Sequence, residues 1–88
     1  MSNLSNSQKN GVLSYIYINH PKEDHIGHLC FAPKSDLKER TGLTVDEIRE
    51  TFNLLQSKGL LVLESENFYG FRFFPNEELY DFMCSGGF

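Results

Sequence analysis

Residues 35–60 constrain the fold more than any other part of the chain, because they predict two helices joined by a tight turn. Thr44 and Glu47 have the Ser/Thr-x-x-Glu spacing of a capping box, in which each side chain pairs with an unsatisfied backbone amide at a helix start. A helix is therefore predicted to begin near Val45. Gly59 is predicted to end it, because glycine adopts the left-handed conformation of a helix C-terminus without steric cost.

The apolar residues of this helix recur at a helical spacing. When successive residues are placed about 100° apart, four of them fall on one arc, which is typical of a face that packs on a core. These residues are Val45, Ile48, Phe52 and Leu55. Upstream, Ser35 is predicted to cap a helix over residues 36–41, and Gly42 to supply the bend that follows. The stretch thus predicts a helix, a glycine turn and a second helix.

The apolar and glycine positions of this stretch resemble those of the winged helix-turn-helix domains of bacterial, archaeal and phage regulators. The positions that carry the resemblance are Leu37, Thr41, Gly42, Leu43, Thr44, Ile48, Phe52, Leu55, Lys58, Gly59, Leu60 and Leu61. In that family the second helix usually enters the major groove of DNA, so the resemblance implies DNA binding. Because hydrophobic spacings carry it, the resemblance says more about the fold than about the function.

The segments before the helix pair are predicted from shorter patterns. Residues 7–19 are predicted as a helix capped by Ser5 or Ser7; their β-branched and aromatic content would also suit a strand, and the resemblance decides for the helix. Residues 28–32 are predicted as a short strand that pairs with a later hairpin, and Pro33 closes it. The inward residues of the helix are predicted to be Val12, Leu13, Ile16 and either Tyr15 or Tyr17.

Two strands of a β-hairpin, the wing of the family, are predicted over residues 60–65 and 69–74. A two-residue tip would set Leu61 opposite Arg72 and so mix apolar and charged side chains on one face. A three-residue tip at residues 66–68 keeps the apolar side chains together, so this register is predicted. Its pairs are Leu63 with Phe71 and Leu61 with Phe73.

A last helix is predicted to begin after Pro75, with Asn76 as its cap and an apolar face of Leu79, Phe82 and Met83. We expect this helix to hold a homodimer, because a small chain rich in aromatic residues has more apolar side chains than its core readily encloses. The alternative is that the helix covers the core of its own subunit. The predicted dimer contacts are Leu79, Tyr80, Phe82 and Met83.

Composition agrees with one small domain, since 40% of the 88 residues are hydrophobic and 14% are aromatic. We predict a disordered N-terminus at residues 1–6, a domain over residues 7–84 and a loose C-terminus at residues 85–88. No apolar run approaches the roughly 20 residues of a membrane span, and no signal peptide opens the chain, so a cytoplasmic protein is expected. Cys30 and Cys84 are expected to be buried free thiols.

All three histidines and one cysteine lie within residues 20–30, and both side-chain types are zinc ligands. The spacing matches no established zinc finger or knuckle, and four ligands in so short a segment are sterically awkward. We therefore expect no metal and no cofactor; the alternative is a zinc site on this segment. The four residues concerned are His20, His25, His28 and Cys30.

Charge is distributed unevenly along the chain. Residues 1–32 and 33–59 are each neutral, so the net charge of −4 lies in residues 60–88. A wing that reads DNA is usually basic, because phosphate contacts supply most of the non-specific affinity; this wing is acidic. On the helix pair, Arg49 and Asn53 are residue types that read guanine and adenine, but neighbouring carboxylates would repel phosphates. The candidate DNA contacts are Lys34, Lys38, Arg40, Thr44, Arg49 and Asn53.

These expectations combine into an α+β winged helix-turn-helix with a three-helix core, a small antiparallel wing and a C-terminal helix. The resemblance implies a small, homodimeric protein that binds double-stranded DNA as a transcriptional regulator or replication accessory factor. The alternative, favoured by the acidic wing, is a winged-helix module that binds another protein and not DNA. The chain is not expected to be an enzyme, because it has no recognisable triad and no phosphate-binding glycine loop.

Overall fold

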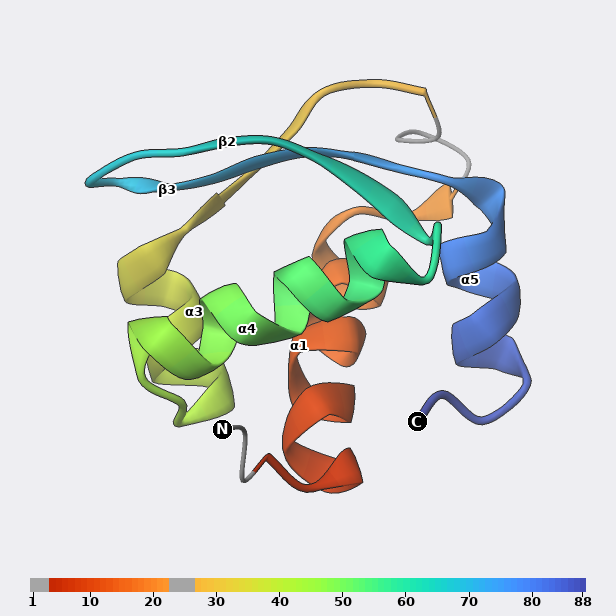
Figure 1. Ribbon diagram of the computed structural model, residues 1–88, viewed down its shortest axis with the longest axis horizontal. Coiled ribbons are helices and arrows are strands. Elements are labelled where there is room, and N and C mark those ends of the chain that lie inside the picture. Colours follow the sequence, from red (N-terminus) through yellow and green to blue (C-terminus); the bar gives the residue numbers. More distant parts are fainter. Residues whose placement is uncertain (1–3, 23–26) are drawn as a thin grey trace.

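Helices α1, α3 and α4 pack against one face of a three-stranded antiparallel sheet in the computed structural model, which describes residues 4–22 and 27–88 (Figure 1). The α+β class is confirmed, and the arrangement is compatible with a winged helix-turn-helix. The elements in chain order are α1 (Asn6–Asn19), β1 (Cys30–Pro33), α3 (Lys34–Thr41), α4 (Val45–Ser57), β2 (Leu61–Glu66), β3 (Gly70–Pro75) and α5 (Glu77–Cys84).

Helix α1 has the capping box that decides between the two predicted caps. The Gln8 N–H donates to Ser5 Oγ at 3.1 Å, and the Ser5 N–H donates to Gln8 Oε1 at 2.8 Å. The helix therefore begins at Asn6, inside the stretch that was predicted to be disordered; residues 1–3 lie outside the described residues. Its buried residues include Tyr15 and not Tyr17, and they are Val12, Leu13, Tyr15 and Ile16.

Helix α3 starts earlier than predicted, and Ser35 does not cap it. The N-cap position is Pro33, and it makes no side-chain hydrogen bond to the helix. Because β1 ends at Pro33 and leads straight into the helix, Ser35 already lies in the first turn. The bend that follows α3 is confirmed at Gly42, which has a φ of 71° in the left-handed region.

The start of α4 is confirmed in detail. The Glu47 N–H donates to Thr44 Oγ1 at 3.2 Å, and the Thr44 N–H donates to Glu47 Oε1 at 2.9 Å. Gly59 follows the helix with a φ of 75°, as predicted for a C-terminal glycine. Of the predicted apolar arc, Ile48, Phe52 and Leu55 are fully buried.

The strand order is β1-β3-β2, and the predicted hairpin register is wrong by two residues at Leu61 and Leu63 and by three residues next to the turn. The turn occupies residues 67–69 instead of 66–68, and an irregularity lies between Leu63 and Ser65. Because the error is an even number of residues at Leu61 and Leu63, the predicted inner face survives there, and Leu61, Phe71 and Phe73 are buried. The observed pairs are Leu61 with Pro75, Val62 with Phe74, Leu63 with Phe73, Ser65 with Arg72 and Glu66 with Phe71.

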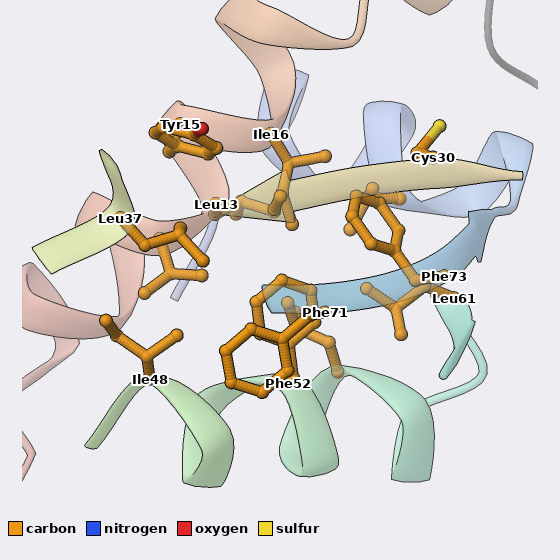
Figure 2. Close-up of a cluster of buried hydrophobic side chains, with 14 of the residues drawn as sticks. Leu13, Tyr15, Ile16, Cys30, Leu37, Ile48, Phe52, Leu61, Phe71 and Phe73 are labelled. Atoms are coloured by element: carbon orange, nitrogen blue, oxygen red, sulfur yellow. The ribbon is translucent and has the colours of Figure 1, made fainter. Parts of the chain in front are cut away.

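The core lies between the inner face of the sheet and the helices. Figure 2 shows the Phe52 ring from α4 next to the aromatic rings of β3. Its centroid is 4.7 Å from that of Phe71, with the two planes only 11° apart, and 5.3 Å from that of Phe73. Leu13 and Ile16 reach the same cluster from α1 (Figure 2). Helix α4 is therefore fixed to the sheet through aromatic contacts.

The C-terminal segment is not loose. The Phe88 N–H donates to Asn10 Oδ1 at 2.8 Å, and Asn10 Nδ2 donates to the Phe88 carbonyl at 3.3 Å. The ring of Phe88 also meets that of Phe82 edge to face, with centroids 5.1 Å apart. Asn76 occupies the N-cap position of α5, but its side chain donates to the Gly59 carbonyl at 2.9 Å and does not cap the helix.

Two further expectations concern the cysteines and membranes. Cys30 and Cys84 are free, as predicted, but only Cys30 is buried, because Cys84 ends α5 on the surface. Burial raises the pKa of the Cys30 thiol. Across residues 4–22 and 27–88, the helices are all too short or too polar to span a bilayer.

Candidate functional site

The six candidate DNA contacts lie on the helix pair, but the chain's own carboxylates already hold several of them. Glu66, at the end of β2, is the centre of the largest such cluster. Arg49 Nε donates to Glu66 Oε1 at 2.6 Å and Nη2 to Oε2 at 2.7 Å, and Lys34 Nζ lies 2.8 Å from Oε2. Arg49 Nη1 also donates to Asp46 Oδ1. We call these four residues, Lys34, Asp46, Arg49 and Glu66, the Glu66 cluster.

Partial burial strengthens the Glu66 cluster relative to an ordinary surface ion pair. The side chains of Lys34 and Glu66 are only 17% and 20% exposed, and the Arg49 contact is bidentate. Hydrogen bonding from Arg49, supported by Lys34, lowers the pKa of Glu66 to about 2, and the same contact raises the pKa of Arg49. At neutral pH, a phosphate would have to compete with this carboxylate for both cations.

A second carboxylate holds Arg40. Arg40 Nε donates to Asp36 Oδ1 at 3.1 Å, and the Tyr15 hydroxyl donates to Asp36 Oδ2 at 2.6 Å. The hydrogen bond from Tyr15, and then that from Arg40, lowers the pKa of Asp36. This arrangement ties α1 to α3, so Arg40 has a structural contact independent of any ligand.

The remaining candidates leave little positive charge on the exposed side of α4. Within the described residues, the side chains of Lys38 and Asn53 make no hydrogen bond or ion pair, whereas the Thr44 hydroxyl is used in the capping box. Asn53 follows Glu50 and Asp46 on the exposed face, which lie about one and two turns before it. The face that would enter a DNA groove is therefore acidic.

The opposite side of the molecule carries exposed apolar side chains. β1 and β2 turn Phe31 and Val62 away from the helices, and both are exposed, while Phe74 on β3 is half-buried beside Val62. None of the labelled helices lies on this side of the sheet (Figure 1). We call this face the outer sheet surface and define it as Leu29, Phe31, Val62, Glu64, Arg72 and Phe74.

One ion pair lies among these apolar residues. Arg72 Nε is 3.5 Å from Glu64 Oε2, and both side chains are a little under half exposed. Phe31 pairs with Arg72 across the strands, and its ring covers Gly70. A Cβ at Gly70 would lie 2.3 Å from the Ala32 carbonyl and 2.8 Å from the Phe31 ring, so this close approach requires glycine.

The turn of the hairpin, residues 67–69, presents two aromatic rings to solvent; we call it the wing tip. Phe68 and Tyr69 are 87% and 74% exposed, and their rings meet edge to face with centroids 5.4 Å apart. Asn67 Oδ1 accepts from the N–H groups of Tyr69 and Gly70 at 2.8 and 3.0 Å, and the Lys34 N–H donates to the Tyr69 carbonyl at 2.8 Å. These bonds fix the turn and pre-position its rings.

The predicted tip at residues 66–68 places Phe68 in the turn but Tyr69 in a strand. The signal that could have corrected this is Asn67, because asparagine readily forms a turn with the backbone two residues on. A tip centred one residue later would have placed Phe68 and Tyr69 in the turn. The outer sheet surface also follows from period two once Cys30 and Ala32 are placed inside.

The predicted dimer contacts on α5 do not form a free surface. Leu79 and Tyr80 are only 1% and 2% exposed, and the Tyr80 hydroxyl donates to the His20 carbonyl at 2.6 Å. Phe82 and Met83 are half-buried against the core of the same chain. For Leu79 and Tyr80, the alternative that α5 covers its own subunit is the correct one.

The histidine segment can be described only in part. His25 lies outside the described residues, so the alternative of a zinc site with four ligands falls partly outside them. Among the residues that are described, no three histidine, cysteine or acidic side chains gather at one place. The expectation that no metal is bound stays a prediction.

A small cleft lies between the ends of α1 and α5, with a volume of about 170 Å³. The exposed Cys84 borders it, and its Sγ is 3.9 Å from the Tyr17 hydroxyl. The lining is formed by Tyr17, Pro21, Lys22, Tyr80, Asp81 and Cys84. The volume is smaller than the roughly 300 Å³ at which small-molecule pockets usually begin.

Comparisons of the chain with protein-family models, with curated proteins and with solved structures gave no match.

Proposed function

We propose that the chain is a protein-interaction module on a winged helix-turn-helix frame, and that it associates through the outer sheet surface and the wing tip. One observation carries this proposal: three of the four cations expected to contact DNA are held by internal carboxylates, while large apolar side chains are exposed on the opposite side. Contiguous exposed apolar residues on a small protein commonly mark an association surface.

Electrostatics support the same choice. The net charge of −4 opposes approach to a polyanion, and the exposed face of α4 adds Asp46 and Glu50 at the position of closest approach. The outer sheet surface, in contrast, combines one carboxylate and one guanidinium with four apolar residues. Such a composition suits the partly apolar surface of another protein.

A pair of photo-crosslinking variants tests the proposal. A benzophenone amino acid at Val62 probes the outer sheet surface, and the same group at Asn53 probes α4; both positions are exposed, so neither variant disturbs the core. Irradiation of cells that make the protein should give protein adducts from Val62 and few from Asn53. Adducts from Asn53 alone would contradict the proposal.

A second candidate function is DNA binding as a regulator or replication accessory factor. It is favoured by Lys38 and Asn53, which are exposed near the helix-turn-helix bend and have no ion pair within the described part of the chain. Fluorescence anisotropy with mixed-sequence duplex at about 0.15 M salt tests it. Binding below about 10 μM that Asn53→Ala abolishes would establish this candidate over the first.

A further inference from the structure

We propose that the partner of the outer sheet surface is a second copy of the same chain, packed face to face about a two-fold axis. This inference rests on the proposed function, because it names the partner for the surface assigned there. It replaces the dimer contacts predicted on α5, two of which are buried in their own subunit.

The charge pattern of the surface is self-complementary. Arg72 lies on the central strand with Phe31 on one side of it and Glu64 on the other, and the pair of Val62 and Phe74 lies next to them along the strands. A two-fold rotation places Arg72 of one copy opposite Glu64 of the other and repeats that contact once more. A uniformly basic or acidic partner would instead place a like charge against one member of this ion pair, which is unfavourable.

Pairing of strand edges is a less suitable way to associate. On β2, the Leu63 N–H donates to Gln56 Oε1 at 2.7 Å, so an inter-strand donor is already used. The same strand is irregular between Leu63 and Ser65, and β1 is four residues long and ends in Pro33. Short strands, bulges and proline are features that discourage pairing between strand edges. The two copies are therefore expected to associate through the faces of their sheets.

The acidic part of the chain does not oppose this contact. Glu77, Glu78 and Asp81 belong to α5, which lies at one end of the sheet and not over its outer face (Figure 1). The Phe31 ring lies over Gly70, which has no side chain, so no further side chain projects from this part of the face. Two such faces can therefore come together without bringing the carboxylates of α5 between them.

The size of the surface predicts a weak dimer. Strands of six residues and three strands across give a face about 20 Å by 14 Å, well below the roughly 800 Å² that each partner buries in a stable complex. The exposed rings of the wing tip add to this area. We expect a dissociation constant on the order of 100 μM.

Sedimentation velocity from about 10 μM to about 1 mM tests the inference with charge-reversed variants. Wild-type mass should rise toward that of two chains. Arg72→Glu and Glu64→Arg should each weaken association at least about tenfold, because each sets like charges opposite one another across the axis. An equimolar mixture of the two variants should restore it, because each then meets its opposite charge.

Glu50→Arg is the matched control, since it makes the same charge change on the exposed face of α4. It should leave association within about twofold of wild type. A wild-type chain that stays monomeric at about 1 mM, or a mixture that fails to restore association, would overturn the second copy as partner. If the benzophenone variant at Val62 then links to a different protein, the proposed function stands; if it links to none, the proposed function fails as well.

Discussion

The side of the molecule formed by α3 and α4 and the outer side of the sheet differ in how their side chains are paired. On the side of α3 and α4, Arg49, Lys34 and Arg40 are each bound by a carboxylate of the same chain. On the outer side, Phe31 and Val62 are left to solvent. The difference teaches that a side chain of a DNA-reading type indicates DNA binding only when the fold leaves its charge available.

The largest expected effect is at Phe52, on the buried side of the sheet. Phe52→Ala should lower the free energy of unfolding by about 3–5 kcal/mol, because it removes a fully buried ring that stacks on β3. Urea denaturation followed by circular dichroism measures this. A loss below about 1 kcal/mol would mean that the aromatic cluster does not hold α4 to the sheet.

Glu66→Gln should have the next largest effect, because it removes the charge that holds Arg49 and Lys34. We expect a loss of about 1–2 kcal/mol in the free energy of unfolding, given that the cluster is partly exposed. The control is Glu64→Gln, which should change it by less than about 0.5 kcal/mol. The same Glu66 variant should bind duplex DNA more tightly than wild type in anisotropy titrations, since two cations are released.

Acid should weaken the Glu66 cluster, because it protonates Glu66. The pKa of Glu66 falls from its ordinary value of 4.5 to about 2 in the folded chain. Its contribution to stability is therefore complete above about pH 4.5 and is lost as the pH falls toward about 2. Thermal melts across this range should show a smaller loss in Glu66→Gln than in wild type. Equal losses in the two proteins would show that other carboxylates, such as Asp36, carry the acid sensitivity.

The smallest effect on stability is expected at the wing tip. Phe68→Ala should change the free energy of unfolding by less than about 0.5 kcal/mol, because the ring is almost fully exposed. Asn67→Ala is the informative companion, since it removes the acceptor that fixes the turn and should destabilise the hairpin more than Phe68→Ala does. Equal and large losses in both variants would mean that the Phe68 ring is part of the core.

Features that depend on neighbours in sequence could be predicted from the sequence. The capping box at Thr44 and Glu47, the glycine bend at Gly42 and the buried face of α4 all follow from spacings within a few residues. The hairpin register was missed because the hydrogen bonds of Asn67 to the turn amides compete with hydrophobic pairing when the turn is placed.

The ion pairs of the candidate site could not be read from the sequence in the same way. Arg49 and Glu66 are 17 residues apart, and Tyr15 and Asp36 are 21 apart, so only the fold brings them together. Charge counts along the chain correctly placed the excess of carboxylates in the C-terminal third. They did not reveal that one of those carboxylates reaches back to the helix pair.

An amide NMR concentration series tests most directly whether the outer sheet surface, and not α4, is where the chain associates. Spectra from about 50 μM to about 1 mM should show progressive shifts at Phe31, Val62 and Arg72, with the amides of α4 unchanged. Shifts concentrated on α4 or α5, or an absence of shifts over the whole range, would contradict this account.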